Sequence, residues 1–321
     1  MGTNIGILPQ ESIVFATICW YLVRIHYILH NFVREESFMA MKNVLSVCVL
    51  SVILSACCVA CGNKTAAKGT VERSQTAAAA VAPADKAPEP VKYTYKVTAV
   101  YPHDTEAYTQ GLFWKDGFLY EGTGENGKSE LRRVNLADGR VLQRSGLERR
   151  YFGEGIAYHD GHIYQLTWIA GRAFVYDADD FRRVRSFVYD GEGWGLTSDG
   201  EYLYMSDGSS KIYVRNPKTF AVERTFDVVA GGRPVEMLNE LEWVDGRIWA
   251  NRYLYNEIVI IDPATGYVTG VVDLNGLQAP EDRFPETDVL NGIAYDEATG
   301  SIYLTGKRWN KIYRVEITEV A

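Results

Sequence analysis

Five residues stand at the same place in a repeated sequence frame, and their types suit the binding of a polar, uncharged group. The frame occurs as "TQGLFWKDGFLYEGTG", "GEGIAYHDGHIYQLTW", "GWGLTSDGEYLYMSDG", "LNELEWVDGRIWANRY" and "LNGIAYDEATGSIYLTG". The residues at the aligned place are Gln110, Glu154, Trp194, Asn239 and Asn291. Carboxamides donate and accept hydrogen bonds, an indole offers an apolar wall, and a carboxylate can exchange a proton. A structural channel could carry Ser, Thr or Val in every copy.

Glu154 is the only carboxylate among these five residues and the best candidate for proton transfer. It stands between two glycines and two places after Phe152. An aromatic neighbour and partial burial would raise the pKa of its carboxyl group toward the range in which it exchanges protons at neutral pH. The alternative is a solvated glutamate that only lines an open channel.

Other residues could complete a site at the same point. Trp168 and Trp249 are taken to end the second strands of their frames, and Lys307 in "TGKRW" could bring a positive charge. Each has a structural alternative, because tryptophans often pack between sheets and a lone lysine in a loop is usually solvated. Asp207 and Asp288 are expected to cap turns.

The spacing of the aligned residues predicts the element that positions them. Consecutive copies are 44, 40, 45 and 52 residues apart. Each frame contains two strands and is followed by a third, such as "LRRVNL", and the first four continue with a fourth, such as "GRVLQRSG". A period in the forties with four strands per unit is typical of a β-propeller blade. In a propeller the first strands line the central channel, so the aligned residues would meet at one mouth.

The two ends of the repeat region complement each other. The fifth unit stops at Val320 without a fourth strand, while "YTYKVTAVYP" before the first unit belongs to no frame. The N-terminal strand would therefore complete the last blade and leave no open edge there. We predict an all-β fold over residues 92–321, a five-bladed β-propeller closed by its N-terminal strand. A β-sandwich would not predict repeats of this length.

Composition excludes several other classes of site. The cysteines are Cys19, Cys48, Cys57, Cys58 and Cys61, so a disulfide, a thiol nucleophile or a cysteine zinc site is excluded after residue 61. The few histidines lack metal-ligand spacing, and there is no Ser-His-Asp constellation or glycine-rich phosphate loop. We expect no metal and no cofactor. The net charge of −8 leaves no basic stripe, so nucleic acid is not an expected partner.

The N-terminal part predicts export and anchoring. Residues 41–61 have the basic start, apolar stretch and small-residue ending of a secretory signal, and "LSAC" resembles a lipobox that would place a lipid on Cys57. Cys61 is the weaker competitor, and an ordinary cleaved signal or a membrane anchor is the alternative. Residues 1–40 are interpreted as an N-terminal extension, with a membrane segment as the alternative, and residues 62–91 as a disordered linker. We expect a lipid-anchored, monomeric protein on the periplasmic side of a bacterial cell envelope.

A family resemblance covers the whole globular part. The motifs "YTQGL", "FGEGIAY", "GEGWGLT", "LNELEW", "IWAN", "LNGIAY" and "TGKRWNKIY" follow in this order between residues 93 and 320. Through them the chain resembles the plant and bacterial glutaminyl-peptide cyclotransferases, a five-bladed propeller family. The resemblance implies an acyltransferase that converts the N-terminal glutamine of peptides or proteins to pyroglutamate and releases ammonia, without a catalytic metal.

The resemblance also implies roles for individual residues. Glu154 would be catalytic, and the substrate would be bound by Tyr108, Gln110, Phe152, Trp168, Trp194, Asn239, Trp249 and Lys307. Tyr108 stands where the family usually has phenylalanine, which keeps the ring and adds a hydroxyl. Gln110 would hydrogen-bond the substrate near the reacting centre, a task that an aliphatic side chain cannot perform.

The expected reaction is an attack of the substrate's neutral α-amine on its own γ-carboxamide. Glu154 would take a proton from the amine and return it to the departing ammonia, while amides and Lys307 stabilise the oxyanion. One alternative is a non-catalytic propeller that binds a peptide or protein at the cell envelope. A lactonase-like propeller is a poorer alternative, because it would need several channel carboxylates and a divalent cation, and the aligned set contains one carboxylate.

Overall fold

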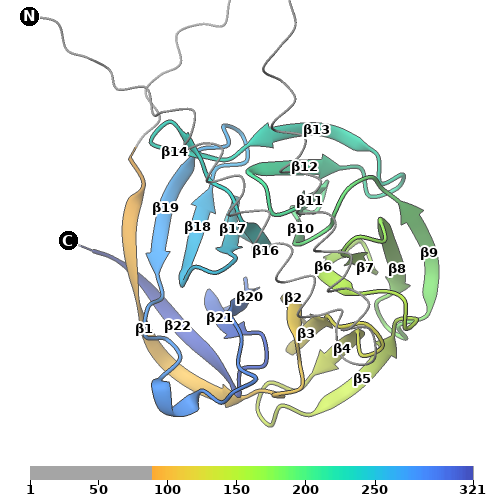
Figure 1. The fold of residues 1–321 in the computed structure, drawn as a ribbon, viewed down its shortest axis with the longest axis horizontal. Helices are drawn as coiled ribbons and strands as arrows, with labels where there is room; N and C mark the ends of the chain where they lie inside the picture. Colours follow the sequence, from red (N-terminus) through yellow and green to blue (C-terminus); the bar gives the residue numbers. More distant parts are fainter. Residues whose placement is uncertain (1–88, 321) are drawn as a thin grey trace, which may run out of the picture. The chain divides into compact units, whose positions relative to one another are not determined.

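The computed structural model describes residues 89–320, whose regular structure is almost entirely β-strand (Figure 1). The only helical element among them is a 3₁₀ turn, η1 (Pro280–Asp282). The predicted all-β class is therefore confirmed. Within these residues no helix has the length and hydrophobicity needed to cross a membrane. The predicted extension, the signal segment with Cys57, and the linker up to residue 88 lie outside the described residues.

Three four-stranded antiparallel sheets are each formed by consecutive strands. The first contains β2 (Thr109–Lys115), β3 (Phe118–Thr123), β4 (Glu130–Val134) and β5 (Val141–Gly146). The second contains β6 (Gly153–His159), β7 (His162–Thr167), β8 (Arg172–Asp177) and β9 (Arg183–Val188). The third contains β10 (Leu196–Ser198), β11 (Leu203–Ser206), β12 (Lys211–Arg215) and β13 (Val222–Asp227). A short ribbon follows, made of β14 (Val229–Ala230) and β15 (Arg233–Pro234).

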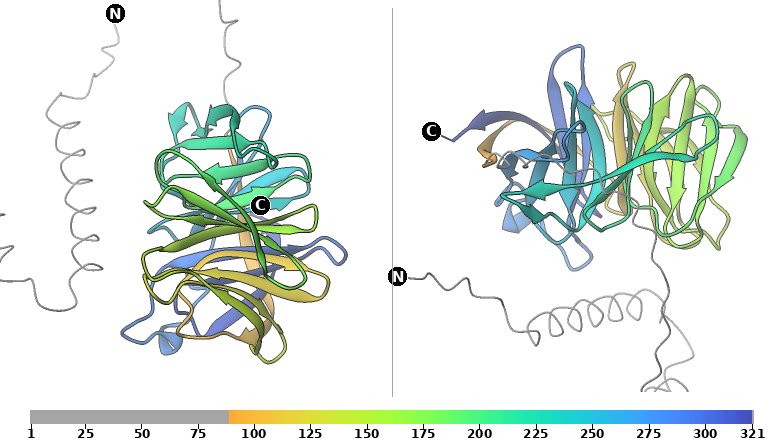
Figure 2. Two further views of the ribbon diagram at one scale, coloured as in Figure 1. Left: turned by 90° about the vertical axis from the view of Figure 1, so that its right-hand side faces the viewer. Right: turned by 90° about the horizontal axis from the view of Figure 1, so that it is seen from above.

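The remaining strands form an eight-stranded sheet in the order β16-β17-β18-β19-β1-β22-β21-β20. Their bounds are β16 (Leu238–Val244), β17 (Arg247–Arg252), β18 (Glu257–Ile261), β19 (Val268–Asp273), β20 (Leu290–Asp296), β21 (Ser301–Gly306), β22 (Lys311–Glu319) and β1 (Val91–Pro102). β1 pairs antiparallel with β22, and the two strands lie side by side in Figure 2. The N-terminal strand thus occupies the place that the incomplete fifth repeat left open. It also pairs in parallel with β19 over three residues.

Asp-Gly turns set the register of three inner hairpins. In the turn between β2 and β3, Asp116 has a φ of 50° and Gly117 a φ of 85°. The Asp-Gly pairs that follow β6 and β16 have the same two positive φ angles. Two consecutive positive φ values define the tight turn whose twist matches that of the flanking strands. Each frame therefore begins as a hairpin that brings the start of its first strand beside the end of its second.

The inner strands β2, β6, β10, β16 and β20 contact one another in a closed series, which Figure 1 shows at the centre of the molecule. Five hydrophobic clusters fill the spaces between neighbouring sets of strands. Each cluster contains one aromatic residue from the same place of the frame, and these are Tyr120, Tyr164, Tyr204, Trp249 and Tyr303. The repeated aromatic residue is therefore a packing element.

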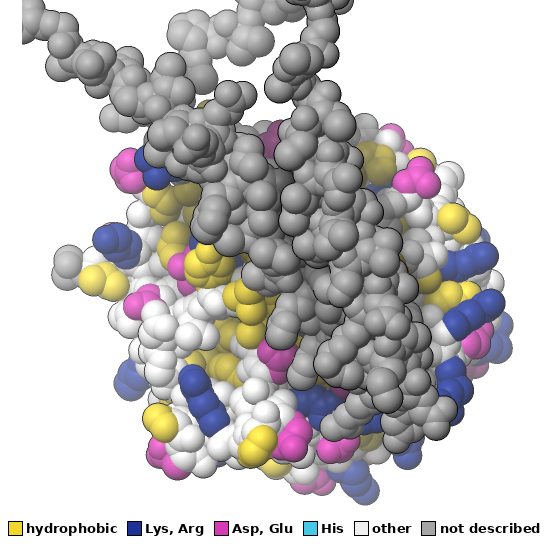
Figure 3. Space-filling view, in the orientation of Figure 1, with side chains coloured by type: hydrophobic (Ala, Val, Ile, Leu, Met, Phe, Trp, Pro, Cys, Tyr) yellow, Lys and Arg dark blue, Asp and Glu magenta, His cyan; other side chains and the backbone are white. Residues whose placement is uncertain are grey.

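Charged side chains of both signs are interspersed along the outer edge of the described part in Figure 3. On the visible portion of this face Lys and Arg side chains are most frequent along the right-hand and lower edge.

Candidate active site

The aligned polar residues lie at β-bulges at the start of the inner strands. In four of the five frames, the pairing of the inner strand with its neighbour shifts register at this place. The residues within the shifts include Gln110, Glu154, Asn239 and Asn291, and all four are buried. A bulge bends a strand and re-aims the side chain of the extra residue. The repeated bulge therefore explains why polar side chains recur where strict alternation would favour a core residue.

Glycines next to the bulges let the inner strands approach one another. A Cβ atom on Gly155 would lie 2.6 Å from the main-chain nitrogen of Leu196, and one on Gly195 would overlap with the main chain of Asn239. Real Cβ atoms do not come so close, so a larger residue would push the strands apart. In the fourth frame this glycine is replaced by Glu240.

Seven side chains form a closed series of contacts at this end of the inner strands, which we call the aromatic rim. Its members are Tyr108, Phe152, Trp168, Glu192, Trp194, Tyr253 and Lys307. Nε1 of Trp168 and Nε1 of Trp194 both donate to Oε2 of Glu192, at 2.8 and 3.0 Å. The Trp194 ring meets Tyr253 edge to face, with 5.7 Å between ring centroids. One carboxylate thus orients two indoles.

The other half of the rim joins aromatic rings to a lysine. Phe152 lies between Trp168 and Tyr108, with ring centroids 5.8 and 6.1 Å apart. Nζ of Lys307 lies 4.9 Å from the ring centroid of Tyr108 and 5.2 Å from that of Tyr253, distances at which a cation is attracted to an aromatic face. Asp288, expected only to cap a turn, also accepts a hydrogen bond from the Tyr108 hydroxyl at 2.9 Å.

Glu154 and Lys307 form the electrostatic centre of the site. Their relative exposures are only 5% and 2%. Burial raises the pKa of Glu154 well above its usual value, and the positive charge of Lys307 opposes this shift only in part. Burial lowers the pKa of Lys307, while the carboxylates of Glu154 and Asp288 oppose that change. The two pKa values therefore move toward each other, which suits a pair that exchanges protons.

Gln110 lies directly beside the rim. A Cβ atom on Gly124 would come within 2.5 Å of the Phe152 ring and 3.1 Å of Cγ of Gln110, so this glycine makes room for both side chains. Nδ2 of Asn291 lies 3.4 Å from Oε1 of Gln110 and donates to the carbonyl of Thr109 at 3.0 Å. The neighbouring inner strand therefore orients the Gln110 amide.

Asn239 joins the site through its main chain. Its carbonyl oxygen accepts a hydrogen bond from Oγ of Ser206 at 2.7 Å and faces Gly195, the residue after Trp194. Its side chain is 2% exposed. The start of β16 is thereby held against β11 of the third sheet, next to Trp194.

Trp249 lies outside the aromatic rim, and Tyr253 occupies the position in the rim that was predicted for Trp249 from the sequence. Trp249 lies within β17 and packs in the cluster that contains Leu290 and Ile293, whereas Tyr253 follows the end of β17 and joins the rim. The frame itself carries the missing signal, because "IWANRY" aligned on "IYQLTW" matches Tyr253 with Trp168 and leaves Trp249 at the packing aromatic. Taking Trp249 as the end of the second strand was therefore wrong.

Two further carboxylates enter the space between the inner strands. Oε1 and Oε2 of Glu240 accept hydrogen bonds from the main-chain nitrogens of Leu112 and Ile293, at 3.1 and 3.0 Å. Oε1 of Glu242 accepts one from the main-chain nitrogen of Tyr295 at 2.9 Å. The aligned set contains one carboxylate, but counting only this set underestimates the acidic side chains near the channel, since residues after the aligned place also reach the space between the inner strands. Both carboxylates connect inner strands rather than gather at the rim.

The described residues contain no set of side chains arranged to bind a metal ion. Among residues 89–320 no group of three or more His, Cys, Asp or Glu side chains is arranged to hold a metal ion. The acidic side chains of the inner strands instead bind main-chain amides or face Lys307.

Comparison with known proteins assigns the family. A sequence profile of the glutamine cyclotransferase family matches residues 70–317, more than half of the chain. Glutaminyl-peptide cyclotransferase of Arabidopsis thaliana is 36% identical over 230 residues, which cover 70% of this chain and 72% of that protein. The crystal structure of Myxococcus xanthus glutaminyl cyclase superposes with a TM-score of 0.69 at 36% identity, over 73% of this chain and 100% of that chain. The chain therefore belongs to the glutamine cyclotransferase family and is an acyltransferase enzyme.

Proposed function

We propose that the protein converts the N-terminal glutamine of peptides or proteins to pyroglutamate and releases ammonia, without a metal ion. The observation that carries this proposal is the buried pair of Glu154 and Lys307, in which Lys307 belongs to the aromatic rim. A proton-exchanging carboxylate next to a cation is what an intramolecular aminolysis requires, because a proton must be moved while an oxyanion develops. The family relationship supports the same reaction.

In the first step the neutral α-amine of the substrate attacks the carbon of its own γ-carboxamide, and a carbon–nitrogen bond closes a five-membered ring. Glu154 accepts the proton that the amine loses. The positive charge of Lys307 and the amide of Gln110 stabilise the oxygen as it becomes negative. The rim aromatics hold the side chain in the curled conformation, and an oriented intramolecular attack of this kind can gain several kcal/mol, on the order of 7 or more.

In the second step the tetrahedral intermediate collapses. The bond to the amide nitrogen breaks, and Glu154 returns its proton so that ammonia leaves as a neutral molecule. The carboxyl group ends in the state in which it began, and the products are a pyroglutamyl peptide and ammonia. A carboxyl pKa raised by burial favours this return, because proton transfer is most efficient when the pKa of the catalyst lies near the working pH.

The test is ammonia release from a short peptide that begins with glutamine, followed by mass spectrometry of the peptide. The control peptide has the same sequence with an acetylated α-amine, which cannot attack. Addition of a chelator should leave the rate unchanged, and a loss of activity that is restored by a divalent cation would refute the metal-independent reaction. Binding of the first peptide without ammonia release would favour the non-catalytic alternative.

We further propose that the sheets form a five-bladed propeller, in which the eight-stranded sheet represents the fourth and fifth blades joined through β1. The closed series of inner strands and the five inter-sheet clusters support this count. From the sequence we also propose a lipid on Cys57, a flexible linker from residue 62 that ends where β1 begins at Val91, and a monomeric enzyme on the periplasmic side of a bacterial envelope. Mass spectrometry of the membrane-extracted protein would test the lipid.

A further inference from the structure

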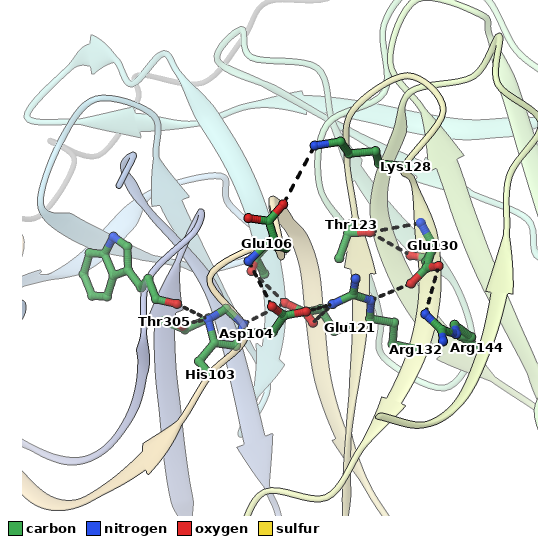
Figure 4. A network of polar contacts seen from close by, with 12 residues as sticks. His103, Asp104, Glu106, Glu121, Thr123, Lys128, Glu130, Arg132, Arg144 and Thr305 are labelled. Atoms are coloured by element: carbon green, nitrogen blue, oxygen red, sulfur yellow. Dashed lines mark hydrogen bonds and ion pairs between the residues drawn. The ribbon is translucent and has the colours of Figure 1, made fainter. Parts of the chain in front are cut away.

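A buried ion pair that the proposed mechanism does not use lies beside the site. His103 follows β1, Glu121 lies in β3, and Nε2 of His103 is 2.9 Å from Oε1 of Glu121. Their side chains are 3% and 2% exposed. Figure 4 shows the pair at the centre of a polar network that continues to Arg132 and Asp104. Such a network between two sheets calls for an explanation, because buried charges are costly unless they are well paired.

The contacts of His103 define its protonation. Nδ1 lies 2.7 Å from the carbonyl oxygen of Trp309, which can only accept, so Nδ1 must carry a proton. Nε2 faces Glu121, whose Oε1 already accepts a hydrogen bond from Thr109 at 2.7 Å. A neutral ring would have no second proton to offer, and two acceptors would then oppose each other. The geometry therefore requires a proton between Nε2 and Oε1, which an imidazolium against a carboxylate supplies.

The charges around the pair agree with this state. Burial alone would lower the pKa of His103, but Glu121, the Trp309 carbonyl and Asp104 together raise it. The pKa of Glu121 is lowered, because His103, Arg132 and the Thr109 hydroxyl outweigh the effect of burial. The other neighbour of the ring is Thr305, whose hydroxyl oxygen lies 3.3 Å from Nδ1.

The two ends of the ion pair hold the main chain next to site residues. On one side Trp309, which accepts the hydrogen bond of His103, stands two places after Lys307. On the other side Thr109, which donates to Glu121, directly precedes Gln110. The two segments are also joined directly, since the main-chain nitrogen of Arg308 donates to the carbonyl of Ala107 at 2.8 Å.

We propose that His103 is a positioning residue of this enzyme. As an imidazolium held by Glu121, it fixes the carbonyl of Trp309 and with it the turn that carries Lys307. This role rests on the proposed cyclotransferase reaction, in which Lys307 faces the developing oxyanion. A structural ion pair alone would affect only folding, whereas a positioning residue also affects kcat in the folded enzyme.

Two substitutions separate the contacts of His103. The amide nitrogen of asparagine can take the place of Nδ1, and that of glutamine the place of Nε2. His103→Asn should keep the hydrogen bond to Trp309 and retain kcat within about threefold, whereas His103→Gln should lose it and lower kcat by about 10- to 100-fold, because small misplacements of a catalytic group cost this much. KM should change little in either variant. His159→Gln, at a half-buried histidine outside the network, is the matched control.

Thermal unfolding and far-UV circular dichroism would establish that each variant is folded, and kcat would be measured well below its unfolding temperature. Equal losses of kcat in both His103 variants, or no loss in His103→Gln, would overturn the inference, because positioning through Trp309 predicts this order of activities. If His103→Gln does not fold, the role of the Trp309 hydrogen bond is tested with His103→Asn alone. Its kcat should stay within about threefold of the wild type, and its tryptophan fluorescence should match that of the wild type. A large loss in folded His103→Asn would also overturn the inference.

Nuclear magnetic resonance of the imidazole groups tests the charge state without any turnover. Both ring nitrogens of His103 should remain protonated at a pH just above about 6.5, the ordinary histidine pKa, because the pKa of His103 is raised. The His103 signals are assigned by their loss in His103→Asn. An unprotonated Nδ1 at that pH in an active enzyme would overturn the inference, because His103 would then have no proton to donate to the carbonyl of Trp309. A doubly protonated His103 in a protein that releases no ammonia would instead refute the proposed function and leave the ion pair standing.

Discussion

Replacing Glu242 by glutamine is expected to stabilise the protein increasingly as the pH rises. Glu242 is buried, and burial raises the pKa of its carboxyl group from 4.5 to about 8, against the hydrogen bonds that it accepts. A carboxyl group with a raised pKa in the folded state binds its proton more tightly there than in the unfolded chain. The stabilisation of the folded state that comes from this tighter proton binding is therefore fully present below pH 4.5 and is lost as the pH rises toward 8.

The magnitude follows from the shift. Each pKa unit corresponds to about 1.4 kcal/mol, so the full shift corresponds to about 5 kcal/mol. For the interval from about pH 5 to about pH 7 the same linkage gives about 2.5 kcal/mol of lost unfolding free energy. Glutamine has nearly the same shape and keeps an oxygen for the main-chain nitrogen of Tyr295, which Glu242 binds at 2.9 Å. It cannot ionise, so it escapes this loss.

The assay is urea unfolding of wild type and Glu242→Gln at a series of pH values. The difference in unfolding free energy should be small near pH 5 and should favour the variant by about 2 to 3 kcal/mol near pH 7. Glu316→Gln, at an exposed glutamate of β22, is the matched control and should show no such trend. A difference that does not depend on pH, or a variant that is less stable near pH 7, would refute the reasoning.

Three further predictions concern the site. Glu154→Gln should keep the melting temperature of the wild type but lower kcat by about 100- to 10,000-fold, measured as ammonia release, because the proton acceptor is lost. Lys307→Met removes the positive charge that partly lowers the pKa of Glu154, so the acid limb of the pH profile of kcat/KM should move to higher pH. An unchanged acid limb would show that the charge of Lys307 does not act on Glu154. Glu192→Leu removes the shared acceptor of two rim indoles and should raise KM by about tenfold, whereas Glu192→Gln should restore most of the affinity. Near-identical KM values in the two Glu192 variants would contradict that role.

The position of the rim residues follows from the hairpin geometry. The first and second strands of each frame are antiparallel, so the residue after the second strand lies beside the start of the first. Trp168, Tyr253 and Lys307 each follow a second strand, β7, β17 and β21. Gln110 and Glu154 lie at the bulges that begin two first strands. The site is thus assembled from two places of one repeated unit.

The sequence by itself determined the strands, their turns and the place where polar residues converge. Repeats of similar length, Asp-Gly turns and alternating apolar residues are local signals, because each depends on residues close together in the chain. The incomplete fifth repeat even indicated that the N-terminal strand pairs with the last one, as β1 and β22 do.

Only the tertiary structure decided which side chains meet. Tyr253 rather than Trp249 joins the rim, and Glu240 and Glu242 reach main-chain amides of other inner strands. His103 and Glu121 form their ion pair from separate elements. These contacts depend on register shifts of a single residue and on the distance between neighbouring sheets. Neither the register shifts nor the distance between sheets can be predicted from a local sequence pattern. Burial, which shifts the pKa values, arises only when the sheets pack against one another.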